Sequence, residues 1–303
     1  MDPADSPALA RAAWKPQALA HAARADATTA GRRERSARGE HHAIEDFLYE
    51  YYSTRPSLLR RWHPGVGVVL EDAPEHAGWK FYRTATGRTS VDVEAFWEAR
   101  SGAAQQIERL LGATATRPAR LGCFGLHEWA MVYRAGEDLR HPLPLRLGQE
   151  GTDAVVESHP ISCTHFDAFR FFTPQAAPLN TLQPTRVNQV DLEQPGCLHA
   201  TMDLYKWAAK LTPAIPSDLV LDAFELALEV RRVDMRASPY DVSSFGLATI
   251  AVETPEGKRQ YAAAQRGFAD QGAVLRRRLL AALDAVKAHV ADPSGCATMT
   301  TAG

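Results

Sequence analysis

The sequence predicts a mainly α-helical protein, folded as a single helical-bundle-like domain with a minor antiparallel β hairpin. Apolar residues recur at the spacing of a helical face over several long segments, and this periodicity is the main reason for the prediction. The hydrophobic period changes to that of strands in only one region, residues 66–83. The length of 303 residues and the apolar content of 45% allow one large core to form without disulfide bonds.

The N-terminal residues 1–42 are rich in alanine and arginine and poor in large apolar side chains. Although residues 8–27 can be helical, only Trp14 and Leu19 offer much apolar surface to bury. We therefore expect residues 1–42 to form a flexible or loosely packed arm. The globular helical domain is expected to span residues 43–290, followed by a disordered tail at residues 291–303.

The domain is expected to begin with a helix at residues 44–52, which a following proline ends. Apolar runs at residues 66–70 and 79–83 come next and are expected to pair as the antiparallel hairpin. A long helix is then expected at residues 92–111, with Gly112 as its C-terminal stop.

The rest of the domain shows helical periodicity in five places. A loop is expected at residues 136–160, where prolines and glycines are frequent. The last helix has a strong start signal, with a threonine cap, a proline in the first turn and an acid near the positive end of the helix dipole. The five helices are expected at residues 126–133, 165–172 and 198–211, from Ser217 to about Arg236, and from Pro255 onward.

The composition argues against several classes of protein. The formal net charge of −2 gives no excess of cations of the kind that non-specific nucleic-acid binding requires. The cysteines form no CxxC pair, so neither a disulfide framework nor a cysteine zinc site is expected. Without a signal-peptide pattern or an apolar run long enough to span a membrane, the chain is expected to be cytoplasmic and to have no membrane partner. The cysteines are Cys123, Cys163, Cys197 and Cys296.

Four histidines in the predicted core helices each have a carboxylate close by in the sequence. Burying such titratable pairs is costly unless each polar group is hydrogen-bonded, and sequences that accept this cost often do so at a functional site. The alternative is that each histidine is an ordinary capping or hydrogen-bonded residue. The pairs are His42 with Asp46, His127 with Glu128, His165 with Asp167, and His199 with Asp203.

The spacing of these pairs favours the helix at residues 198–211 as the catalytic one. His199 and Asp203 are four residues apart and share a helix face, and Lys206 lies one turn further along the same stripe. With Asp203 as its partner, His199 would have a pKa near neutrality, which suits general acid and base catalysis. The alternative is that this polar stripe is the solvent-facing edge of an amphipathic helix.

A metal site is a weaker prediction. The members of the pairs at residues 127–128 and 165–167 point in different directions on a helix, so ligands would have to come from several helices. The chain lacks the repeated Glu-x-x-His motif of di-iron bundles. The sequence therefore identifies neither a metal nor any other cofactor.

Two polar segments are candidates for substrate binding. The arginine-dense residues 231–241 include Arg232 and Arg236, which could bind a carboxylate or phosphate. The amide-rich residues 180–189 include Asn188 and Gln189, which could line a pocket. The alternative reading of the arginines is a set of surface ion pairs.

Four segments carry a resemblance to a known family: residues 55–65 (RPSLLRRWHPG), 125–134 (GLHEWAMVYR), 196–207 (GCLHATMDLYKW) and 235–241 (MRASPYD). The chain resembles, over most of residues 20–285, an actinobacterial family commonly labelled 3-methyladenine DNA glycosylase. The resemblance implies an N-glycosidic hydrolase that acts on a modified base. It supplies no established catalytic motif.

The resemblance also implies a role for Asp92. Helix-hairpin-helix glycosylases carry a hairpin resembling Leu-Pro-Gly-Val-Gly, followed further along the chain by an aspartate that assists N-glycosidic cleavage. Residues 58–67 (LLRRWHPGVG) match this hairpin in part, and Asp92 lies near the expected place, though somewhat late. Two features depart from that pattern. Residues 68–70 are expected to be a strand where the family has a helix, and Asp92 is well placed as a helix cap.

The sequence is compatible with three functions. The resemblance implies a 3-methyladenine DNA glycosylase-like hydrolase, which needs a basic groove beside a pocket that holds one carboxylate. The residues alone favour a helical-bundle enzyme acting on a small molecule, with or without a metal, if His127, His165, His199 and Asp203 converge. The third is a non-enzymatic binding protein. The expected partner is a small molecule or a modified nucleobase, and the net charge does not support DNA.

Overall fold

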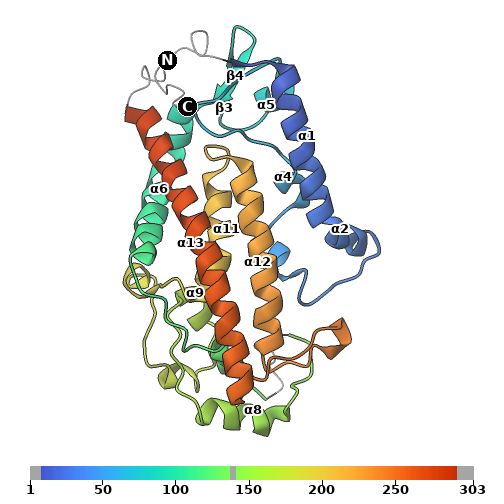
Figure 1. Cartoon of the computed structure of the whole chain (residues 1–303), viewed down its shortest axis with the longest axis vertical. Helices are drawn as coiled ribbons and strands as arrows, with labels where there is room; N and C mark the ends of the chain where they lie inside the picture. The colour runs from blue at the N-terminus through green and yellow to red at the C-terminus, as the bar shows by residue number, and fades with distance from the viewer. Residues whose placement is uncertain (1–7, 137–140, 292–303) are drawn as a thin grey trace.

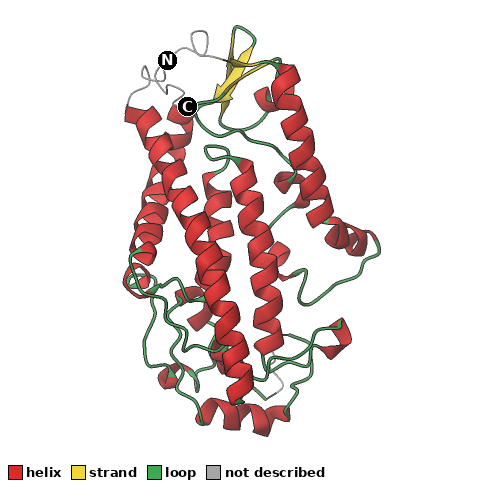
Figure 2. Ribbon diagram, in the orientation of Figure 1, coloured by secondary structure: helices red, strands yellow, loops and turns green. Residues whose placement is uncertain are grey.

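The computed structural model describes residues 8–136 and 141–291 and has a mainly α-helical fold with a small sheet at one end (Figures 1 and 2). Four long helices run side by side along the molecule and contact one another through their apolar faces. They are α6 (Val93–Ala115), α11 (Leu198–Leu211), α12 (Ser217–Ala237) and α13 (Pro255–Ala291). These helices form the predicted bundle and its core.

The helical prediction is wrong in one predicted loop and at several helix ends: the helices predicted at residues 44–52, 126–133 and 165–172 are shorter, at 47–51, 126–130 and 166–169. Helix α6 continues past Gly112 to Ala115, because the last turns bury Leu111 and Thr114 against the bundle. Helix α8 lies inside the segment predicted as a loop, where it buries Val155 and Val156. The shorter helices are α3 (Phe47–Tyr51), α4 (Pro56–Leu59), α5 (Pro74–Ala77), α7 (Leu126–Ala130), α8 (Gly148–Glu157), α9 (Phe166–Phe169) and α10 (Gln189–Leu192), with 3₁₀ turns η1 (Ala177–Leu179) and η2 (Ser243–Phe245). No helix in the described residues combines the length and the apolar content needed to cross a membrane.

The sheet has four short strands instead of the two that the sequence predicts. The two predicted strands do not pair with each other; both pair antiparallel with β4, and β1 is parallel to β2. Thr86 and Gly87, both with positive φ, make the hairpin turn between β3 and β4. In sheet order the strands are β1 (Ala8–Leu9), β2 (Val69–Glu71), β4 (Arg88–Val91) and β3 (Tyr82–Ala85).

The described part of the N-terminal arm is packed, which contradicts the prediction of a flexible or loosely packed segment at residues 1–42. It forms α1 (Arg11–Thr28) and α2 (Ala30–Ala37). Trp14 is 0% exposed and donates through Nε1 to the carbonyl of Glu71 at 2.9 Å. His21 on the same helix is also buried, with Nδ1 2.7 Å from Oδ1 of Asp218, and the buried alanines of α1 let the helix approach the domain closely. Residues 1–7 and the predicted tail, apart from Ala291, lie outside the described residues.

One histidine beneath the arm should contribute to a loss of stability toward acid pH. His63 is 5% exposed, and its Nδ1 lies 3.0 Å from the hydroxyl of Tyr82. Burial, with a smaller contribution from His76, lowers the pKa of His63 from 6.5 to about 3. Between these two values the unfolded chain binds a proton that the folded chain excludes. Stability is therefore lost as the pH falls, by up to about 1.4 kcal/mol per pH unit.

Urea unfolding at pH 6 and pH 5 measures this loss. The variant His63→Gln keeps a partner for Tyr82 but does not titrate, so between these two pH values it should lose about 1 kcal/mol less free energy of unfolding than the wild type. Equal losses in the two proteins would show that His63 does not contribute to the pH dependence.

Candidate active site

Three histidines that are far apart in the sequence come together inside the bundle. His127 lies in α7, His165 immediately precedes α9, and His199 lies in the first turn of α11. The ring centroid of His199 is 4.5 Å from that of His127 and 5.4 Å from that of His165. All three side chains are buried. The structure thus brings together the imidazoles on which the small-molecule enzyme hypothesis depends.

His127 forms an ion pair with an aspartate from α12. Its Nε2 donates to Oδ1 of Asp234 at 3.0 Å, and its Nδ1 lies 3.4 Å from the sulfur of Cys123. Burial opposes the charged form, but Asp234 outweighs it and raises the pKa of His127 well above its usual value. Gly125, which precedes α7, has a positive φ, a left-handed conformation that favours glycine. A Cβ at this position would also lie only 3.3 Å from Tyr261. His127 therefore holds a proton in the folded protein.

A buried arginine neutralises the carboxylates around His127. Arg231 is fully buried, and its Nη1 donates to Oε1 of Glu128 at 3.0 Å and lies 3.5 Å from Oδ2 of Asp234. Its guanidinium also covers the ring of Phe47 at 3.9 Å. Two carboxylates, one guanidinium and one imidazolium therefore share a site from which water is excluded. Such a group is stable only while each charge keeps a partner.

His199 is the neutral member of the cluster, and this corrects the prediction that its pKa would lie near neutrality. Burial, followed by the charge on His127, lowers the pKa of His199 well below its usual value. Its Nδ1 is buried without a hydrogen-bond partner among the described residues. An orphaned buried polar atom costs about 1–3 kcal/mol, and a bound ligand would remove this cost.

One atom from each of four buried residues could hold a cation. The ligand-capable atoms of His127, Glu128, His199 and Asp234 all lie within 4.8 Å of one another. They come from α7, α11 and α12, so the bundle itself fixes their positions. Imidazole nitrogens and carboxylate oxygens together suit Zn²⁺, Mn²⁺ and Fe²⁺.

His165 differs from His127 and His199, because both of its ring nitrogens face groups outside the four-residue cluster. Its Nδ1 accepts the N–H of Ala168 at 3.3 Å and caps α9. Its Nε2 faces Oδ2 of Asp203 at 3.4 Å and Oε2 of Glu193 at 3.6 Å. Burial opposes protonation, but Asp203 and Glu193 raise the pKa of His165. A ring held in this way suits proton transfer better than metal binding.

Hydrogen bonds lead from Asp203, whose Oδ2 lies 3.4 Å from Nε2 of His165, to a pocket at the surface. Asp203 accepts from the hydroxyl of Tyr52 at 2.7 Å and from Nζ of Lys206 at 2.9 Å. Lys206 also donates to Oδ2 of Asp167 at 2.6 Å. Tyr52, Asp167 and Lys206 line a pocket of about 500 Å³, which we call the lysine pocket. The predicted polar stripe of α11 is therefore real, but it faces this pocket and the buried network.

The predicted substrate-binding arginines lie outside the centre. Arg232 is exposed and pairs with Glu45, while Arg236 donates to the carbonyl of Ala248. Both are on α12, but they point away from the side occupied by Asp234. The surface ion-pair reading is correct for Arg232.

The two amide residues differ from each other. Asn188 closes its own loop through hydrogen bonds with the backbones of Thr185 and Gln183, so it has a structural role. Gln189 is buried, and its Nε2 donates to Oε2 of Glu193 at 3.0 Å. Gln189 therefore supports the carboxylate that faces His165.

Asp92 and the fourth histidine pair are structural. Asp92 accepts the N–H of Ala95 at 3.1 Å and caps α6, which begins beside the sheet (Figure 1). Asp46 accepts from Arg32 and Arg35 and so ties α2 to the domain, and its partner His42 is not part of the centre.

Sequence reasoning missed Arg231 and Asp234 as site residues. Both continue the apolar stripe of α12, because Phe224, Ala227, Arg231 and Asp234 follow one another at spacings of three and four residues. A buried arginine and a buried aspartate on such a stripe are the signal that could have identified them.

Comparison with known proteins gives no relative from which a function could be transferred. No family model matches the chain, and neither a curated protein nor a solved structure is significantly similar to it. The resemblance to the glycosylase-labelled family therefore stays a prediction.

Proposed function

We propose that the protein is a metal-dependent helical-bundle enzyme that acts on a small molecule. The observation that carries the proposal is the buried cluster of His127, Glu128, His199 and Asp234, whose ligand-capable atoms lie within 4.8 Å of one another. The Nδ1 of His199 adds to it, because this atom is buried without a hydrogen-bond partner among the described residues and belongs to a ring that packs against His127.

Without a cation, the charges of the cluster compensate one another. His127 keeps its proton because Asp234 stabilises it, and Arg231 neutralises the carboxylates. Binding of a divalent cation would release the proton of His127 and weaken the contacts of Arg231. When bound, such a cation lowers the pKa of a coordinated water, which suits hydrolysis.

The second half of the network would handle the protons of the reaction. His165 exchanges a proton with Asp203 or Glu193, which face its Nε2. Lys206 and Asp167 connect Asp203 to the lysine pocket, where a small molecule can enter. This arrangement links a buried general acid or base, His165, through Asp203 to residues that line a pocket.

The alternative, a glycosylase, has less support than the metal-dependent enzyme, because the residues that the resemblance implies have other roles here. Asp92 is used as a helix cap, and β2 stands where a helix-hairpin-helix motif has its second helix. Base release would then have to use another carboxylate.

A titration of metal-stripped protein with Zn²⁺ and Mn²⁺ tests the proposal. At least one of these ions should bind with one-to-one stoichiometry and raise the melting temperature, since a ligand at a hundred times its dissociation constant stabilises by about 2.7 kcal/mol. Release of 3-methyladenine from alkylated DNA is measured alongside. Failure of both ions to bind would refute the metal centre, and base release by the stripped protein would favour the glycosylase.

A further inference from the structure

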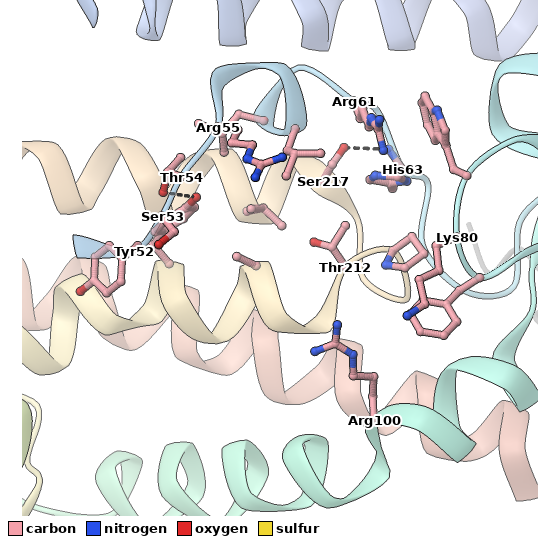
Figure 3. A pocket seen from close by; sticks show the side chains of 18 residues that line it. Tyr52, Ser53, Thr54, Arg55, Arg61, His63, Lys80, Arg100, Thr212 and Ser217 are labelled. Carbon is pink, nitrogen blue, oxygen red and sulfur yellow. Dashed lines mark hydrogen bonds between the residues drawn. The ribbon is translucent and has the colours of Figure 1, made fainter. Parts of the chain in front are cut away.

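A second hollow lies beside the lysine pocket and has a different character. It has a volume of about 310 Å³ and shares Tyr52, Arg100 and Tyr205 with the lysine pocket. Figure 3 shows the guanidinium groups of Arg55 and Arg100 entering this space from opposite sides. We call it the cationic hollow, and its charged lining residues are Arg55, Arg61, Lys80 and Arg100.

These four cations are not balanced by acids. The lining of the hollow includes no aspartate or glutamate, and none of the four cations forms an ion pair with another described residue. Several other arginines of the described residues are paired with acids, as Arg24 is with Glu225 and Arg146 with Glu253. A protein with a net charge of −2 therefore concentrates unpaired positive charge around one concave site. Such a site attracts anions.

The walls between the cations are largely apolar and aromatic. Leu59 and Val220 line one part of the hollow, and Trp79 and Phe81 line another. The guanidinium of Arg61 lies 5.2 Å from the ring centre of Trp79, and Nζ of Lys80 lies 4.6 Å from that of Phe81. The hollow therefore offers apolar and aromatic surface together with positive charge.

We infer that the cationic hollow binds a small organic phosphate that carries a flat ring, about the size of a mononucleotide. Arginines bind phosphate through paired N–H donors, and the aromatic walls can stack on a ring. The volume of the hollow is at the lower end of the range for small-molecule sites, so it suits one ring and one phosphate. Binding here needs no metal, so the inference goes beyond the proposed function and can be tested separately.

The position of the hollow relates it to the histidine centre. Tyr52 forms part of its wall and donates a hydrogen bond to Asp203, which faces His165. A ligand in the hollow would therefore lie next to the residues that connect the surface with the buried network.

Calorimetric titration of the full chain with three probes tests the inference. The probes are adenosine 5′-monophosphate, adenosine and inorganic phosphate, all at low ionic strength. The nucleotide should bind at least about tenfold more tightly than either of the other two, because only it uses both the cations and the apolar walls. The double variant Arg55→Gln/Arg100→Gln should weaken nucleotide binding at least about tenfold.

The matched control is Arg266→Gln. Arg266 is an exposed arginine of α13 that forms no ion pair with another described residue, so this variant should bind like the wild type. Melting temperatures of all the proteins confirm that they are folded. The inference fails if adenosine binds as tightly as the nucleotide, if no probe binds, or if the double variant is unaffected. A short single-stranded oligonucleotide that binds much more tightly than the nucleotide would instead assign the hollow to nucleic acid.

Discussion

The variant His199→Ala should bind Zn²⁺ or Mn²⁺ at least about a hundredfold more weakly than the wild type, since it loses a directly coordinating nitrogen. His199 is the one neutral imidazole in the cluster, and its Nδ1 has no other partner among the described residues. It can therefore bind a cation without first losing a proton or a hydrogen bond. Calorimetry on metal-stripped protein at pH 7.5 measures the difference.

The matched control for this prediction is His165→Asn. His165 is as buried as His199, and the two rings lie 5.4 Å apart. Its Nδ1 is committed to the N–H of Ala168, and asparagine can replace it as the cap of α9. Metal affinity should change less than about tenfold, as for a neighbouring residue that is not a ligand. Equal losses in the two variants would contradict the assignment of the ligands.

Helical periodicity made the bundle predictable. The sheet and the docking of the N-terminal helix depend on contacts between distant residues, which local sequence patterns do not show. Helices α11, α12 and α13 follow long apolar stripes and begin at or within a residue of the predicted positions. Strand β4 reads Arg-Thr-Ser-Val, which has no apolar alternation, so its role as the partner of two other strands is invisible in the sequence. Helix α1 docks through Trp14, His21 and two buried alanines, and this pattern has too few large apolar side chains to mark a packed segment in the sequence.

The candidate site was partly predictable for a similar reason. The histidines and several carboxylates could be selected because charged pairs interrupt apolar helices. Their partners could not, because Asp234 is 107 residues from His127 in the sequence and Tyr52 is 151 residues from Asp203. Neighbours in the sequence are not always partners, because His127 pairs with Asp234 and Glu128 accepts from Arg231. Proximity in sequence identified the residue types, but only the packing of the helices assigns the pairs.

The variant Arg231→Met should be destabilised by about 3–5 kcal/mol when no metal is present, because it leaves buried carboxylates without their compensating cation. The same change removes a positive charge that competes with a divalent cation for Glu128 and Asp234. Added Zn²⁺ or Mn²⁺ should therefore restore most of the lost free energy of unfolding. Urea denaturation with and without the ion, at constant pH, measures both effects.

The neighbouring variant Arg232→Met separates this effect from a general loss of charge on α12. Arg232 is exposed and pairs with Glu45 at the surface, so its loss should cost less than about 1 kcal/mol and should not alter the response to metal. If Arg231→Met were as stable as the wild type without metal, the carboxylates would not depend on the arginine. If it were destabilised and metal gave no recovery, the carboxylates would be too far apart or too poorly oriented to bind a cation. In that case the cluster would be a structural ion-pair network, and the metal centre would have to be abandoned.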